Sequence, residues 1–84
     1  MTSHPNRNWR SRWAVGGQEA RHLTTGLIVR FERAQGAGAW DGQATNAQEV
    51  LQALQAAGSP DIARTLARLM REAGEIFAER QHDR

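Results

Sequence analysis

The side chains that could carry out acid–base or metal chemistry are scattered along this sequence. The three histidines, His4, His22 and His82, are far apart, and no two of them have the i, i+4 spacing that places two imidazoles on one helix face. There is no cysteine to supply thiolate ligands, and no glycine-rich motif has the spacing of a phosphate-binding loop. The sequence therefore predicts a protein that is not an enzyme and that holds neither a metal ion nor a cofactor.

Arginine is the residue type whose distribution indicates a function. All eleven cationic side chains are arginine, against nine carboxylates, and the formal net charge is +2. Residues 1–40 contain six arginines and two glutamates, whereas residues 41–84 contain five arginines and seven carboxylates. A guanidinium excess in one half of a chain attracts anionic partners, and nucleic acid is the first of these to consider.

A cluster of cations and aromatics lies near the N-terminus. Arg7, Trp9, Arg10, Arg12 and Trp13 interleave guanidinium groups with indoles, a pattern that binds phosphates by charge and bases by stacking. The alternative is structural and equally consistent with the pattern. On a strand, Trp9 and Trp13 would share one face and pack in the core, which would leave Arg10 and Arg12 in solvent.

Two alternating segments predict the strands that position these residues. The first runs over residues 9–15 and ends at Gly16 and Gly17, where a hairpin turn is expected. The second and clearer strand covers residues 23–33, with Gly26 marking a bulge or turn. One face of it carries Leu23, Thr25, Leu27, Val29 and Phe31, and the other carries His22, Thr24, Ile28, Arg30 and Glu32. Residues 35–45 are expected to form a loop around Trp40, with that indole folded back onto the core.

Two amphipathic helices are predicted to follow the strands. Asn46 with Glu49 three residues later has the pattern of an N-cap and capping box, and Gly58 ends the first helix. The second helix is expected to start at once, with Ser59 as its cap. Its apolar stripe consists of Ile62, Leu66, Leu69, Met70, Ala73 and Phe77. Gly74 within this helix predicts a close backbone approach.

The predicted organisation is a single small α+β domain, a short antiparallel strand or hairpin followed by two amphipathic helices. Residues 1–8 are expected to be a flexible arm, residues 9–80 the domain and residues 81–84 a tail. The large apolar side chains are few for a lone chain without disulfides, so oligomerisation is the expected source of additional stability. No leader pattern or membrane-spanning apolar run occurs in the sequence, so we expect a soluble, cytoplasmic protein with no membrane partner.

A strand with an outward Arg30, followed by two helices, resembles the ribbon-helix-helix repressors, the family of MetJ and Arc, over about residues 26–80. The resemblance implies a homodimer whose two copies pair one strand each into a ribbon that enters the major groove of double-stranded DNA. It also implies that the segment Gly58-Ser59-Pro60 anchors a backbone phosphate. Two features depart from that family, namely the long link at residues 35–45 and the Trp-rich N-terminal segment.

These observations predict a homodimeric, DNA-binding transcriptional repressor. The expected DNA-binding residues are Arg30, Ile28, Glu32, Arg33, Ser59, Arg10 and Arg12. Arg30 is expected to face the bases, and Ser59 to orient a phosphate. The alternative is a protein-interaction module with no nucleic-acid role, in which an intrachain hairpin packs on the helix pair and a sheet edge or the Arg/Glu face of the last helix meets a partner.

Overall fold

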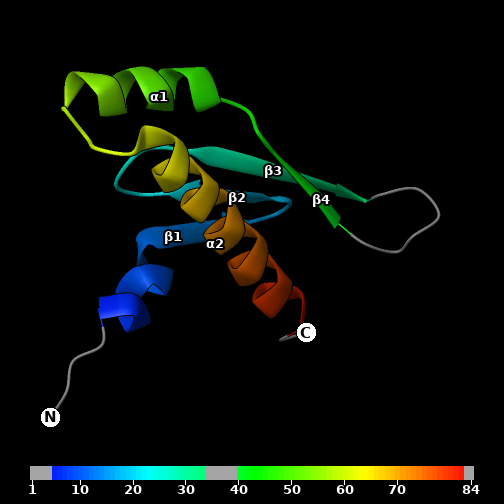
Figure 1. Cartoon of the computed structure of the whole chain (residues 1–84). Coiled ribbons are helices and arrows are strands. Elements are labelled where there is room, and N and C mark those ends of the chain that lie inside the picture. The colour runs from blue at the N-terminus through cyan, green and yellow to red at the C-terminus, as the bar shows by residue number, and fades with distance from the viewer. Residues whose placement is uncertain (1–4, 34–39, 83–84) are drawn as a thin grey trace, which may run out of the picture.

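Strands fill the first half of the chain and helices the second (Figure 1). The computed structural model describes residues 5–33 and 40–82. The elements are the 3₁₀ helix η1 (Pro5–Arg12), the strands β1 (Trp13–Gly16), β2 (Glu19–His22), β3 (Ile28–Arg33) and β4 (Trp40–Ala44), and the helices α1 (Ala47–Ala56) and α2 (Ile62–His82). Residues 1–4 of the predicted arm lie outside the described residues, whereas residues 5–8 belong to η1. Of the predicted tail, residues 81 and 82 continue α2.

The strands form one antiparallel sheet in the order β1-β2-β3-β4. The α+β class is thus confirmed, but the predicted short strand or hairpin is wrong, because the sheet has four strands. Residues 9–12 are helical rather than extended, so the first strand begins only at Trp13. The predicted loop around Trp40 contains β4, which has poor strand formers but is held by pairing with β3. Residues 35–39 of that predicted loop lie outside the described residues.

A tight turn interrupts the long strand that was expected over residues 23–33. The N–H of Gly26 donates to the carbonyl of His22 (2.7 Å), and Gly26 has a φ of 81°, a conformation that glycine adopts without strain. The turn reverses the chain and resets the alternation of side chains. Leu23, expected in the core, is therefore 58% exposed, and His22, expected outside, is only 6% exposed.

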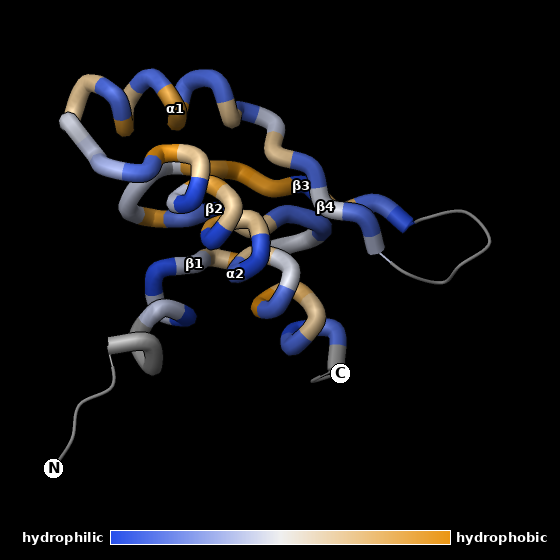
Figure 2. The backbone as a smooth tube through the Cα atoms, in the orientation of Figure 1, coloured by the Kyte–Doolittle hydropathy of each residue, from blue (hydrophilic) through white to orange (hydrophobic). Residues whose placement is uncertain are grey.

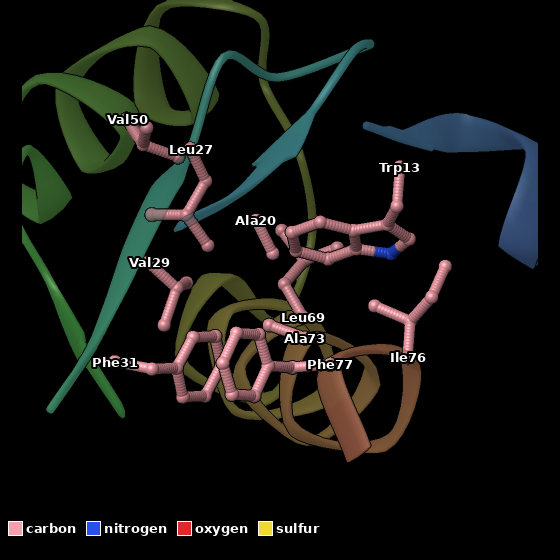
Figure 3. Close-up of a cluster of buried hydrophobic side chains, with 10 residues drawn as sticks. All are labelled: Trp13, Ala20, Leu27, Val29, Phe31, Val50, Leu69, Ala73, Ile76 and Phe77. Atoms are coloured by element: carbon pink, nitrogen blue, oxygen red, sulfur yellow. The ribbon is translucent and has the colours of Figure 1, made fainter. Parts of the chain in front are cut away.

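The core lies between one face of the sheet and α2, which crosses it (Figure 1). Figure 3 shows the ten buried apolar side chains that form it: Trp13, Ala20, Leu27, Val29, Phe31, Val50, Leu69, Ala73, Ile76 and Phe77. The rings of Phe31 and Phe77 stack with their centroids 4.1 Å apart, and Trp40 meets Phe77 edge-on at 5.2 Å. The expectation that Trp40 folds back onto the core is confirmed.

The first helix begins and ends where the sequence predicts, but without the expected capping hydrogen bond. Gly58, with a φ of 72°, and Ser59 donate their N–H groups to the carbonyls of Gln55 and Leu54, which closes α1 with a Schellman motif. Asn46 occupies the N-cap position, but its side chain makes no capping hydrogen bond. The apolar positions of α1 lie on the side turned toward α2 and β3 (Figure 2).

The second helix begins later than the sequence predicts, at Ile62. The first bond of α2 joins the Thr65 N–H to the carbonyl of Asp61 (2.9 Å), so Asp61 and not Ser59 occupies the N-cap position. Gly74 does not mark a close backbone approach, since a Cβ built there meets no atom within 4 Å. Among the described residues, neither helix combines the length and the apolar character needed to cross a bilayer.

Candidate functional site

The residues expected to bind DNA do not come together in one site. Arg30 and Glu32 lie on the outer face of the sheet, the face away from α2, and with Arg33 they line a hollow of about 260 Å³. Arg12 and Ser59 line a separate groove on the opposite side of the sheet. The other two residues have structural partners. The Ile28 N–H donates to Oδ1 of Asn46 (2.9 Å), and Arg10 binds Glu79 through two nitrogens (2.7–3.1 Å).

The strand that was expected to form the ribbon is an inner strand. β3 pairs with β2 at residues 28–30 and with β4 at residues 29–33. Both edges of β3 are thus paired within the chain over most of its length, so β3 is not an edge strand that could pair with a second copy. The expected intermolecular ribbon of β3 is therefore wrong, although Arg30 and Glu32 do lie on the exposed face as expected.

The outer face of the sheet has no excess of positive charge. Its arginines are Arg21 and Arg30, and its carboxylates are Glu19, Glu32 and Asp41. Arg33 pairs with Trp40, whose indole meets the core residue Phe77, so Arg33 belongs to the opposite face. Glu19 lies directly opposite Arg30, whereas the carboxylates Glu32 and Asp41 oppose each other. Because carboxylates outnumber arginines on the outer face, it has no excess attraction for nucleic acid.

The groove that contains Arg12 and Ser59 brings together segments distant in the sequence. It has a volume of about 520 Å³ and lies where η1, the turn between β2 and β3, the link between the helices and the first half of α2 meet. Figure 1 shows that turn and that link on the same side of the molecule. The lining residues are Trp9, Arg12, His22, Thr24, Thr25, Leu54, Ser59, Pro60, Thr65, Arg68, Leu69 and Glu72. The volume is in the range of small-molecule binding sites.

His22 lies in the wall of this groove, and its contacts favour one tautomer. The N–H of Thr25 donates to Nδ1 of His22 (3.3 Å), which favours the neutral ring that carries its hydrogen on Nε2. The Thr25 hydroxyl also lies 2.9 Å from Nδ1 and accepts the N–H of Leu27 (3.3 Å), which directs its own hydrogen toward Nδ1. Trp13 packs beside the ring, with centroids 4.8 Å apart.

The Nε2–H of His22 is a hydrogen-bond donor that reaches the groove. Both hydrogen-bond partners found for this ring are on Nδ1, and no buried side-chain nitrogen or oxygen in the described residues lacks a partner. Nε2 must therefore be accessible, and the groove is the cavity that His22 lines. A side chain that is 94% buried thus presents one N–H to a cavity, which is the geometry of a preorganised donor.

Burial is the main reason that the pKa of His22 is lowered. Burial lowers its pKa from the ordinary value of 6.5, and the cations Arg12 and Arg68 lower it further, while Glu72 acts in the opposite direction. Glu72 is only 17% exposed and is itself engaged, because Oε1 accepts the indole N–H of Trp13 (3.0 Å) and Oε2 lies 3.7 Å from Arg68. The groove therefore holds two guanidinium groups, one engaged carboxylate and a neutral imidazole.

This combination of groups suits an anion. Arg12 and Arg68 supply positive charge, and His22 supplies a fixed N–H. Hydroxyl groups of Thr24, Thr25, Ser59 and Thr65 also line the groove. Such donors bind phosphate and carboxylate oxygens, and the guanidinium groups contribute the stronger, charge-assisted bonds.

The N-terminal helix η1 is held in place by an ion pair with the end of α2. The Arg10–Glu79 hydrogen bonds raise the pKa of Arg10 and lower that of Glu79 from its ordinary value near 4.5. The Arg10 guanidinium also lies over the ring of Trp9, 4.6 Å from its centroid. Arg10 therefore positions the indole that borders the groove. Trp13 packs in the core and Trp9 against it, as the structural alternative expected, but Arg10 is paired with Glu79 and not left in solvent.

Sequence reasoning missed most of the groove. His22 was placed on an exposed strand face, and Arg68 and Glu72 on an outer helix face. The i, i+4 spacing of Arg68 and Glu72 was a usable signal for a local ion pair. Their proximity to His22, 46 and 50 positions earlier in the chain, depends on how α2 crosses the sheet, and no local pattern encodes that.

No family model, curated protein or solved structure matches this chain. In the described part of the chain, no three His, Asp or Glu side chains come together as a metal-binding group. The chemistry of the groove and of the outer sheet face is therefore the basis for a functional proposal.

Proposed function

We propose that this chain binds double-stranded DNA through its phosphates, with the groove beside His22 as the contact. The observation that carries the proposal is the convergence of Arg12 and Arg68 on one cavity with hydroxyl groups around them. Arg12 has no carboxylate partner among the described residues, and the contact of Arg68 with Glu72 is long at 3.7 Å. Guanidinium groups that are not neutralised within the protein are available to replace the counterions of a phosphate backbone.

The N-terminal end of α2 supports the same assignment. Ser59 and Pro60, which precede the helix, and Thr65 in its first turn all line the groove. The helix dipole places partial positive charge at this end, where an anion is stabilised. The expected role of Ser59 near a phosphate is thus retained, although Ser59 caps no helix.

A DNA shift assay at two salt concentrations tests this proposal. Arg12→Ala and Arg68→Ala should each weaken binding to duplexes of any sequence and reduce the slope of log K against log salt by about 1. Arg30→Ala on the outer sheet face and Arg64→Ala on an exposed part of α2 outside the groove are the matched controls. Binding that depends on Arg30 and not on Arg12 or Arg68 would move the contact to the sheet and reject the groove.

A homodimeric transcriptional repressor is a narrower form of the proposal. Two copies would have to present their grooves to sites about one turn of DNA apart, through an interface other than the β3 ribbon. Light scattering of the free protein and of its DNA complex measures the required dimer. A 1:1 complex with DNA would leave phosphate binding in place and remove the repressor geometry.

The second candidate function is a protein-interaction module, and one observation favours it. The outer sheet face is left to solvent within the described residues, and its mixture of acidic and basic groups suits a protein surface better than a polyanion. The outer edges of β1 and β4 are also unpaired within the described sheet, as an added strand would require. A monomer that gives no salt-sensitive DNA shift would favour this candidate over DNA binding.

A further inference from the structure

The Nε2–H group of His22, in the wall of the groove, makes no contact that stabilises the fold of the described residues. His22 contributes to the fold through Nδ1, which binds the turn at Thr25, and through its ring, which packs on Trp13. Its Nε2–H contributes to neither contact and meets the cavity instead. A nearly buried N–H directed at a cavity with two guanidinium groups nearby defines the place where an acceptor atom would sit.

We propose that this groove is a specific binding site for a phosphate group, called the phosphate seat below. In it, Nε2 of His22 donates to a phosphate oxygen that lies between Arg12 and Arg68. Binding of the phosphate dianion is coupled to uptake of a proton by His22. The inference rests on the proposed function for the identity of the anion as a phosphate. It goes further in naming the donor at the seat and its regulation by pH.

The size and lining of the groove indicate that the phosphate belongs to a larger molecule. About 520 Å³ is more than one phosphate group fills, and much of the wall is apolar, from Trp9, Leu54, Pro60 and Leu69. Apolar walls around a few fixed polar groups are the usual composition of a site for an organic ligand. The phosphate group could be supplied by a phosphomonoester such as a mononucleotide or by a DNA strand, and these two sources are separated by experiment below.

The hydrogen bonds of His22 provide the means for proton uptake. In the neutral ring, Nδ1 accepts from Thr25, whereas in the imidazolium form Nδ1 must donate. The Thr25 hydroxyl, 2.9 Å away, can reverse its role and accept this proton, because a hydroxyl rotates and has two lone pairs. The proton comes from solvent, and no covalent bond changes.

The charged groups that face His22 set the direction of the coupling. Arg12 from η1 and Arg68 from α2 oppose the imidazolium form, and Glu72 from α2 favours it. A dianion between the two arginines adds negative charge beside the ring, so it favours the protonated form. By linkage, protonation of His22 strengthens binding of the dianion by the same factor, and affinity rises as the pH falls from the pKa of His22 in the complex to its lower pKa in the free protein.

The test uses the whole wild-type chain, with sulfate as the first probe. Sulfate remains a dianion between pH 5 and 8, whereas phosphate esters protonate near pH 6 and would confuse the result. The pKa of His22 is followed by NMR of its imidazole signals in sodium sulfate and in sodium chloride of equal ionic strength. We expect sulfate to raise this pKa and chloride to leave it unchanged. Equal values in the two salts would overturn the proposal.

Two substitutions of His22 separate its roles. His22→Gln replaces Nε2 with an amide N–H that does not titrate, so sulfate should still bind and the dependence of affinity on pH should disappear. His22→Asn keeps an acceptor near the position of Nδ1 for Thr25 but has no donor at the groove, so sulfate affinity should fall by about tenfold. Circular dichroism establishes that each variant is folded. Unchanged affinity and pH dependence in folded His22→Asn would contradict the assignment of Nε2.

The source of the phosphate is decided with adenosine monophosphate and with duplex DNA. If adenosine monophosphate competes with sulfate and duplex DNA does not, the phosphate seat is supported and DNA binding is rejected. A DNA shift that depends on Arg12 and Arg68, without any response of His22 to sulfate, would reject the seat and retain the proposed function. Binding of all three probes with loss in Arg12→Ala supports both.

Discussion

At the scale of single residues, Gly42 packs directly on the ring of Phe31. A Cβ added to Gly42 would lie 2.6 Å from Cε1 of Phe31, a distance at which the ring must move. The ring cannot move freely, because it stacks on Phe77 at 4.1 Å. We therefore expect Gly42→Ala to lower the free energy of unfolding by about 1–3 kcal/mol, the usual cost of overpacking, in urea denaturation.

Gly74 provides the matched control for this prediction. A Cβ at this helical position meets nothing within 4 Å, so Gly74→Ala should raise the stability by up to about 1 kcal/mol through helix propensity alone. Equal effects of the two substitutions would mean that the steric contact with Phe31 is not the cause.

The same scale shows what a residue pattern can and cannot predict. The outward orientation of Arg30 and the buried positions of Val29 and Phe31 follow from alternation along a strand, and the structure agrees. His22 and Leu23 were assigned to the wrong faces because Gly26 was read as a possible turn within a continuing strand. A turn that reverses the chain resets the alternation of inward and outward side chains. The pattern of apolar and polar residues does not reveal the hydrogen bonds that form such a turn.

At the scale of elements, Asn46 joins the start of α1 to the β2–β3 turn. Its Oδ1 accepts the Ile28 N–H (2.9 Å) and its Nδ2 donates to the Gly26 carbonyl (2.9 Å), so the side chain pairs with backbone as a neighbouring strand would. This explains why the expected cap is missing: the amide can satisfy the turn or the helix, and it satisfies the turn.

Substitution of Asn46 distinguishes between two roles of its side chain, bridging the β2–β3 turn and capping α1. Asn46→Ala should cost about 1–3 kcal/mol, because the N–H of Ile28 loses its partner. Asn46→Ser retains a good capping side chain but is too short to bridge both backbone groups, so it should be nearly as unstable as the alanine variant in urea denaturation. A serine variant as stable as the wild type would show that capping is the dominant role.

The Arg10–Glu79 ion pair connects the first helical element to the last. Both side chains are about half exposed, so the pair is expected to hold η1 in place rather than to add much global stability. Glu79→Gln should therefore speed tryptic cleavage after Arg10 several-fold by local opening, with little change in the unfolding midpoint. Glu75→Gln, which removes a nearby charge without a hydrogen bond to Arg10, should leave the cleavage rate unchanged. A large loss of global stability in Glu79→Gln would contradict a local role.

At the scale of the whole molecule, the helices could be predicted from the sequence and the groove could not. The helices α1 and α2 followed from apolar periodicity over ten or more residues, and the boundary at Gly58 from its role as a terminator. The groove could not be derived in this way, because it depends on where α2 crosses the sheet and on which face each strand turns inward. The position of His22 beside Arg12 and Arg68 is a property of this packing and not of any local segment.

The same packing makes the stability of the whole molecule depend on pH near neutrality. The folded state lowers the pKa of His22 below 6.5, the value expected in the unfolded chain, so the unfolded chain takes up the proton more readily. The resulting stabilisation is fully present above pH 6.5, declines as the pH falls below this value, and becomes constant once the pH is below the pKa of the folded state. Glu79, whose pKa is lowered from about 4.5, contributes in a separate and more acidic range.

Urea denaturation at pH 7.5, 6.0 and 5.0 measures this dependence, which for one group is at most about 1.4 kcal/mol per pH unit. The wild type should lose stability between pH 6.5 and 5, and the non-titrating His22→Asn variant should lose much less over the same interval. Glu79→Gln, in contrast, should follow the wild type above pH 5 and differ from it only in more acidic solution. An equal decline in His22→Asn and the wild type would mean that another histidine, and not the one in the wall of the groove, is coupled to folding.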